Sequence, residues 1–172
     1  MFSFKKIFIS SFLLFLLGSL MHFLYELSGE NFIIGFFTPI NESVWEHLKL
    51  AYFPILLWWI FNFKKADAKN KTKLLSACTS LLFAPLITVF LFYSYSGAFG
   101  TELLWFDILI LFVSIFLGLL LGNHILRVSN PPKWVVRLLF IMTVLMFLAF
   151  LIFTVSPPDI PIFVSPQNLN SL

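Results

Sequence analysis

The sequence is poor in charged residues and in cysteine. Only 11% of its 172 residues are Asp, Glu, Lys or Arg, whereas a soluble domain has about 25%. The single Cys78 excludes an internal disulfide, and because it lies in an apolar run we expect a buried core residue rather than a reactive thiol. The sequence also contains no internal repeat and no P-loop, dinucleotide-binding or zincin motif.

Apolar residues are abundant instead. They make up 60% of the chain, with 24 Phe, and the mean hydropathy is +0.98. Most of the length falls into five apolar segments, each near the roughly 20 residues that cross a bilayer as a helix. We therefore predict an all-α, polytopic membrane helix bundle that forms a single transmembrane domain over residues 1–172. Its helices are expected at about 7–27, 39–63, 74–95, 101–128 and 134–155, followed by a short tail at 156–172.

Basic residues are distributed on one side of this predicted bundle. Of the 11 Lys and Arg residues, all but Lys49 fall at the N-terminus or in and beside alternate loops. This pattern is typical of the positive-inside rule and predicts a multi-pass protein of the cell membrane, with the N-terminus cytoplasmic and the C-terminus outside. The net charge of +3 thus reflects topology, and we expect membrane lipids rather than nucleic acid as partners.

Two segments outside the helices have their own pattern. The apolar run 32–37 is too short to span, which favours an interfacial or re-entrant segment. The tail carries Pro157, Pro158 and Pro161 close together, so we expect it to be extended and stiff. Its Ile and Phe residues could fold back over the helix ends as a lid.

The second predicted helix opens with an unusually polar stretch, residues 38–49. Thr38-Pro39 or Asn41 can start the helix. The side-chain oxygen of Thr38 or Asn41 can accept from the unpaired N–H groups of the first turn, and proline suits the first helical position. A helical register would then place Glu42, Glu46 and Lys49 on one stripe. We expect Lys49 to pair with Glu46, one turn away.

Two other predicted helices carry polar residues in the outer half of the membrane, where residues 38–49 are also expected. His22 and Glu26 are four residues apart and face the same way, although they could simply rest at the headgroups. Asp107 lies about 7–8 Å further in than Glu102, at 1.5 Å per residue. The candidate pocket residues are His22, Glu26, Glu42, Glu46, His47, Lys49 and Asp107.

The charge of this group has to be offset. Its four carboxylates and one ammonium leave an excess that cannot stand unpaired in a low-dielectric site. Three functions remain open: an enzyme for a lipid or other membrane-embedded substrate, with Glu and His as acid, base or metal ligands; proton- or cation-linked binding or transport of a small molecule; or a structural or interaction role. A metal stays unspecified, because Glu-x-x-x-Glu-His is no established zinc signature.

Several motifs resemble those of a family of small bacterial integral membrane proteins of unknown function. They are His22-Phe23, residues 25–29 (Tyr-Glu-Leu-Ser-Gly), residues 39–49 (Pro-Ile-Asn-Glu-Ser-Val-Trp-Glu-His-Leu-Lys), Asp107-Ile108 and the proline-rich tail. The tail departs from the family pattern at Asp159 and Ser165, where the family has His and Asp. The resemblance implies a bacterial plasma-membrane location and brings no activity with it.

Overall fold

The chain folds into helices. A computed structural model describes residues 1–127 and 130–165, and no strand occurs in that part of the chain. Four helices are long and apolar enough to cross a membrane: α1 (Phe4–Leu27), α5 (Asn70–Phe99), α6 (Leu104–Ile125) and α7 (Lys133–Val155). Shorter elements are α2 (Phe32–Gly35), α3 (Val44–His47), α4 (Lys49–Asn62) and the 3-10 helix η1 (Pro161–Phe163). The predicted all-α class is confirmed.

Three of the long helices, α1, α5 and α7, extend slightly beyond their predicted bounds, whereas α6 begins at Leu104, three residues later than predicted. Ser3 caps α1 by accepting a hydrogen bond from the backbone N–H of Lys6, so the helix begins three residues early. α5 continues until Gly100, whose left-handed φ of 66° ends it. The predicted end of the fourth helix at 128 and the last tail residues, 166–172, lie outside the described residues.

The helix predicted at 39–63 is wrong in its first part. The chain stays irregular until Ser43, and the helix then forms as α3 and α4, which meet at Leu48. With 14 residues α4 is about 21 Å long, and nine of those residues are buried. It is the central helix of the fold, in contact with α1, α5 and α6.

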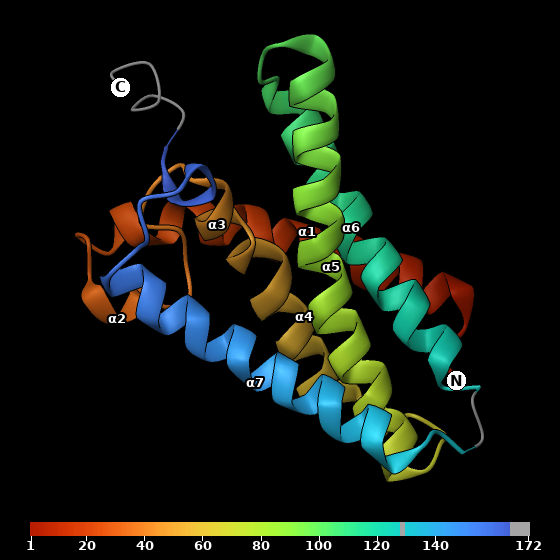
Figure 1. The fold of residues 1–172 in the computed structure, drawn as a ribbon. Coiled ribbons are helices and arrows are strands. Elements are labelled where there is room, and N and C mark those ends of the chain that lie inside the picture. The colour runs from red at the N-terminus through yellow and green to blue at the C-terminus, as the bar shows by residue number, and fades with distance from the viewer. Residues whose placement is uncertain (128–129, 166–172) are drawn as a thin grey trace.

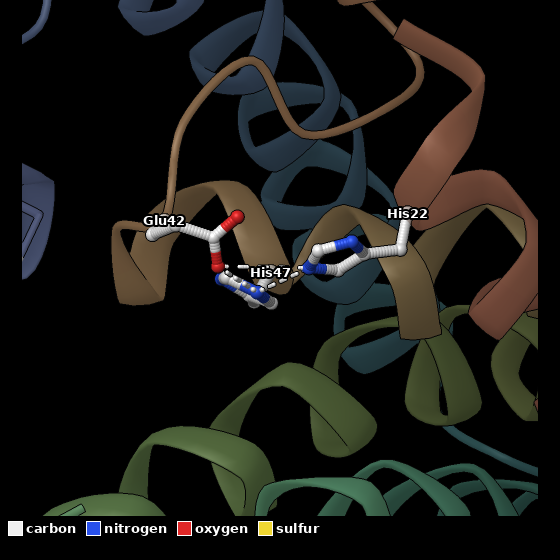
Figure 2. A group of neighbouring side chains, drawn as sticks. All are labelled: His22, Glu42 and His47. Carbon is white, nitrogen blue, oxygen red and sulfur yellow. Dashed lines mark hydrogen bonds and ion pairs between the residues drawn. The ribbon is translucent and has the colours of Figure 1, made fainter. Parts of the chain in front are cut away.

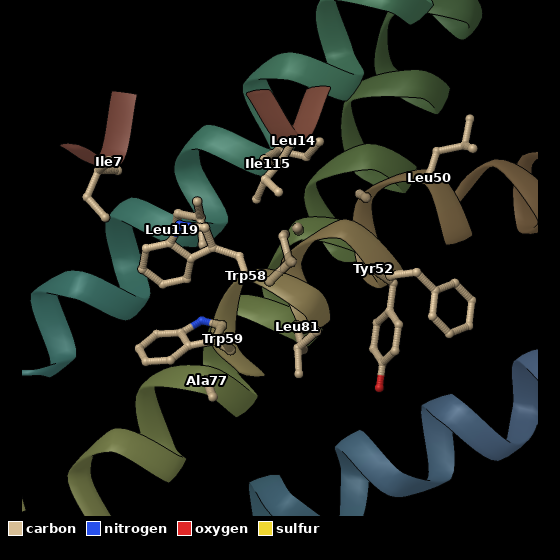
Figure 3. Close-up of a cluster of buried hydrophobic side chains, with 14 of the residues drawn as sticks. Ile7, Leu14, Leu50, Tyr52, Trp58, Trp59, Ala77, Leu81, Ile115 and Leu119 are labelled. Carbon is tan, nitrogen blue, oxygen red and sulfur yellow. The ribbon is translucent and has the colours of Figure 1, made fainter. Parts of the chain in front are cut away.

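Apolar side chains from these four helices form the core around α4 (Figure 3). Ile55 and Ile115 are fully buried, and Trp59 is 2% exposed. The two indoles at the end of α4, Trp58 and Trp59, pack edge to face, with ring centroids 5.1 Å apart. The core therefore surrounds α4 on several sides and holds it in place. The polar segment, residues 38–49, ends at the N-terminus of this helix.

A glycine allows α1 to cross α4 closely. An alanine at Gly18 would place its Cβ 2.5 Å from the carbonyl oxygen of Leu50. That carbonyl cannot receive its usual helical hydrogen bond, because the residue four positions later is Pro54, which has no N–H. Gly18 thus lets the α1 backbone cover the carbonyl that Pro54 leaves unbonded. This crossing holds α1, and with it His22, at a fixed distance from α4.

The remaining helices enclose this pair. α5 and α6 form an antiparallel hairpin with the most extensive helix contact in the structure, and its tip projects beyond the other helices (Figure 1). α7 runs along α5 and brings the chain back to the end of the bundle where α1 ends. There, as predicted, the described part of the tail folds over the helix ends: η1 contacts α3, and the rings of Phe163 and Trp45 lie 4.7 Å apart.

Candidate functional site

His22, Glu42 and His47 meet at the C-terminal end of α1 (Figure 2). His22 comes from α1, His47 from α3, and Glu42 from the loop between α2 and α3. The two Nε2 atoms of the histidines are 3.1 Å apart. The Glu42 Oε2 atom lies 3.6 Å from His22 Nε2 and 3.4 Å from His47 Nε2. We call these three residues the His-Glu-His cluster.

The local sequence explains why Glu42 reaches the histidines. Asn41 Oδ1 accepts a hydrogen bond from the Ser43 N–H, and Ser43 Oγ accepts one from the Glu46 N–H at the start of α3. The chain therefore turns at residues 41–43 and begins its helix after Glu42. The predicted stripe of Glu42, Glu46 and Lys49 is wrong, because Glu42 precedes the helix and points to the His-Glu-His cluster instead.

The tautomer of His47 follows from its backbone contact. Its Nδ1 atom lies 2.8 Å from the carbonyl oxygen of Ser43. A carbonyl only accepts, so Nδ1 carries a hydrogen, and in the neutral ring Nε2 keeps a lone pair. That lone pair faces His22 and Glu42. Such a backbone hydrogen bond is the usual way in which a metal-binding histidine is oriented.

The cluster is short of hydrogens. With neutral His47 Nε2 and the Glu42 carboxylate both acceptors, the cluster has at most one N–H, from His22, for three converging atoms. When the His47 ring is protonated, its Nε2–H donates to Glu42; this hydrogen bond, and then the charge of the ring, hold the pKa of Glu42 below its usual value despite partial burial, and His22 adds to this effect. Glu42 is therefore ionised at neutral pH. The arrangement is best stabilised by a further cation, either a proton or a metal ion.

The distances fit a metal ion. Zinc binds His nitrogen at about 2.0–2.1 Å and carboxylate oxygen at about 2.0–2.2 Å, so two ligands of a tetrahedral site lie about 3.3 Å apart. The three distances in the cluster, 3.1, 3.4 and 3.6 Å, bracket that value. Within the described residues the cluster offers three ligand atoms, which is the number typical of a catalytic zinc with one open position.

A polar cavity of about 320 Å³ adjoins the cluster. His22 and Glu42 contribute to its wall, and so do Glu26 and Glu30. Its other lining residues are Phe23, Tyr25, Pro39, Ile40 and Asn41. The sequence prediction that Glu26 faces the same way as His22 agrees with this arrangement.

Glu46 and Lys49 form a separate, buried pair. The Lys49 ammonium lies 2.6 Å from Glu46 Oε2, and the side chains are 0% and 2% exposed. This confirms the predicted pairing. The pair lies in the protein interior rather than among the ligand atoms of the cluster, so it is not available to substrate.

Asp107 is also set apart from the cluster. Its carboxylate accepts a hydrogen bond of 2.6 Å from the Tyr95 hydroxyl, which in turn accepts one from the Leu103 N–H. Asp107 interacts with His47 only through charge. The group that we predicted as one pocket is thus three groups.

Two relevant residues were missed in the sequence. Ser43 starts the helix, and its signal was present: Ser-x-x-Glu over residues 43–46 is the pattern of a capping box. Thr154 on α7 accepts a hydrogen bond from the Lys49 ammonium. A single threonine in an apolar helix gives no such signal.

Comparison with known proteins shows the family of this chain. No curated protein and no solved structure matches the chain. A family model does match, over residues 2–168. The chain therefore belongs to DUF6512, a family of unknown function.

Proposed function

We propose that this protein is a metal-dependent membrane enzyme, a hydrolase with a divalent zinc-like ion at His22, Glu42 and His47. The observation that carries the proposal is the convergence of three possible ligand atoms, two imidazole Nε2 and one carboxylate oxygen, within 3.6 Å of one another. Two histidines and one carboxylate with an open fourth position are the ligand set of many zinc hydrolases. A bound ion of this kind supplies a hydroxide near neutral pH.

The cavity suggests how the chain's own residues assist. Glu26 lies one turn beyond His22 on α1 and shares the cavity wall with His22 and Glu42. We propose Glu26 as the general base that takes the proton from the attacking water. This assignment separates two roles for carboxylates: Glu42 is a ligand, and Glu26 acts on protons.

The surroundings favour a substrate that comes from the membrane. Leu27 and Ile33, close in sequence to the cavity residues Glu26 and Glu30, are 81% and 68% exposed. Such side chains are suited to contact lipid rather than water. The described cavity wall contains no Lys or Arg, which favours a lipid with a neutral or cationic headgroup over a phosphate monoester.

The basic residues indicate how the protein is oriented in the membrane. We propose that the protein lies in a bacterial plasma membrane with its N-terminus cytoplasmic, as the positive-inside pattern indicates. His22 is five residues from the outer end of α1, about 8 Å along the helix. The cluster would then lie at the outer surface, within reach of headgroups.

Metal content is the first test. Protein purified without added chelator should contain one zinc or similar ion per chain, and His22→Ala should lose it. His124→Ala is the matched control and should keep the ion. His124 is exposed in the last turn of α6, next to Asn123, which bonds Phe2 at the N-terminal end of α1, whereas the cluster lies at the C-terminal end of α1. Metal-free wild type whose activity depends on a proton gradient would instead favour proton-linked transport, the alternative that the His22–His47 contact of 3.1 Å supports.

Turnover is the second test. Vesicles that contain labelled phosphatidylethanolamine, phosphatidylglycerol or a neutral diacylglycerol lipid would be incubated with the protein, and released products measured. We expect Glu26→Gln to retain its metal but to lose 10²- to 10⁴-fold in rate, roughly the range for general-base catalysis. A fully active Glu26→Gln variant would contradict the role given to Glu26.

A further inference from the structure

We infer that Glu46 and Lys49, which bind no metal themselves, are positioning residues that set the geometry of the His-Glu-His cluster; the inference rests on the proposed function. The Lys49 ammonium is fully buried and has four oxygens within hydrogen-bond distance, which its three N–H bonds share. They are the carbonyl oxygens of Gly35 (2.9 Å) and Thr38 (3.3 Å), Glu46 Oε2 (2.6 Å) and Thr154 Oγ1 (2.7 Å). These partners belong to α2, the following loop, α3 and α7.

Glu46 completes the connection to the loop. Its Oε2 atom accepts a hydrogen bond of 3.0 Å from the Ile40 N–H as well as the bond from Lys49. Through these contacts the pair holds residues 35–40 against α3. Glu42 follows only two residues after Ile40, so the position of its carboxylate depends on how this loop is held.

The same pair determines the position of His47. Glu46 and His47 are consecutive residues of α3, and the Ser43 carbonyl that orients the His47 ring belongs to the cap of that helix. Two of the three ligands, Glu42 and His47, therefore lie on segments that the buried pair ties to one another. His22 comes from α1, which is placed independently by the Gly18 crossing.

The stability of the fold alone does not explain why this position holds a buried ion pair. Desolvating two charges generally costs as much as their attraction returns, and apolar residues of similar volume often serve equally well. What a buried lysine with four acceptors provides is a defined arrangement of the segments that carry them. Residues that hydrogen-bond directly to metal ligands typically change metal affinity by 10- to 100-fold when mutated, and we expect an effect of similar size from a pair that positions two ligands through the backbone.

Zinc affinity measured against a competing chelator tests the inference on the full-length protein. Glu46→Gln keeps an acceptor for Ile40 but leaves the ammonium without its counter-ion, and we expect zinc binding to weaken about 10- to 100-fold. Tyr52→Phe is the matched control. It removes another buried hydrogen bond, from Tyr52 to the Thr143 carbonyl, and should leave zinc affinity unchanged. Equal zinc affinity in Glu46→Gln and wild type, with both variants folded, would overturn the inference.

A metal-free measurement separates this inference from the proposed function. In ring ¹⁵N spectra of histidine-labelled apoprotein, assigned with His124→Ala, wild-type His47 should show the single Nδ1–H tautomer. Glu46→Gln should show a mixture, and Tyr52→Phe should resemble wild type. If the wild type binds no zinc, the proposed function fails, but these spectra still test the positioning role of Glu46 and Lys49. An unchanged His47 tautomer in Glu46→Gln would overturn that role.

Discussion

Replacing Lys49 with methionine should destabilise the protein strongly. Methionine fills a similar volume but cannot donate, so the carboxyl group of Glu46, 2% exposed, is left with only the Ile40 N–H as partner, and the oxygens of Gly35, Thr38 and Thr154 each lose a donor. Removing one partner of a buried ion pair costs about 3–5 kcal/mol. For a chain of this size each kcal/mol is worth about 2–4 °C, so the melting temperature should fall by roughly 6–20 °C.

A double-mutant cycle in detergent tests the reasoning behind this figure. Glu46→Gln added to Lys49→Met removes the unpaired carboxylate, so the double variant should recover part of the loss, with a coupling free energy of about 0.5–3 kcal/mol. Each thermal melt should be recorded at the same detergent concentration and without metal, so that ion loss does not contribute. Strictly additive losses, or a Lys49→Met protein that melts like the wild type, would refute the account of this pair.

Three further predictions concern other parts of the molecule. Gly18→Ala should lower the melting temperature, because its Cβ would meet the Leu50 carbonyl at 2.5 Å, whereas Gly97→Ala, with no atom within 4 Å, should be neutral or slightly stabilising in thermal melts. For Glu42, whose pKa is lowered by the contact with His47, the stabilisation is present above the unfolded value of about 4.3 and lost as pH falls through the folded value. The melting difference between metal-free wild type and Glu42→Gln should thus be full above that unfolded value and shrink as the pH falls further below it; a difference of the same size at pH 7 and at pH 2 would contradict this account of the Glu42 charge. In a Cys78→Ser background, Glu30→Cys and Asp159→Cys should react with an impermeant thiol reagent on intact cells and Lys65→Cys should not; the reverse labelling would invert the proposed topology.

Much of the fold was predictable because the bilayer imposes a simple length rule. α1, α5, α6 and α7 are apolar runs of 22 to 30 residues, and any such run is expected to be a spanning helix. The start of the predicted second helix failed for a local reason. Thr38, Asn41 and Ser43 are all cap-forming residues. In the structure Ser43 caps the helix by accepting from the Glu46 N–H, whereas Asn41 accepts from the Ser43 N–H and turns the chain before it.

The candidate site was predicted as one group and proved to be several. Helical spacing correctly paired Glu46 with Lys49, because both lie within a turn of each other on continuous helix. It failed for Glu42, which lies outside the helix and contacts His22 across 20 residues of sequence. Contacts of that kind depend on the crossing of α1 and α4 and on the α2–α3 loop, and helix periodicity carries no information on either. The partner that α7 provides, Thr154, was hidden for the same reason.

X-ray absorption at the zinc edge tests the central claim most directly. On protein loaded with one equivalent of zinc, the account predicts two imidazole nitrogens at about 2.0–2.1 Å and carboxylate and water oxygens at about 2.0–2.2 Å. His47→Ala should lose one imidazole shell, and Glu42→Gln should change the oxygen shell alone. Zinc bound without imidazole ligands, or with both imidazoles retained in His47→Ala, would contradict the assignment of the His-Glu-His cluster as the metal site.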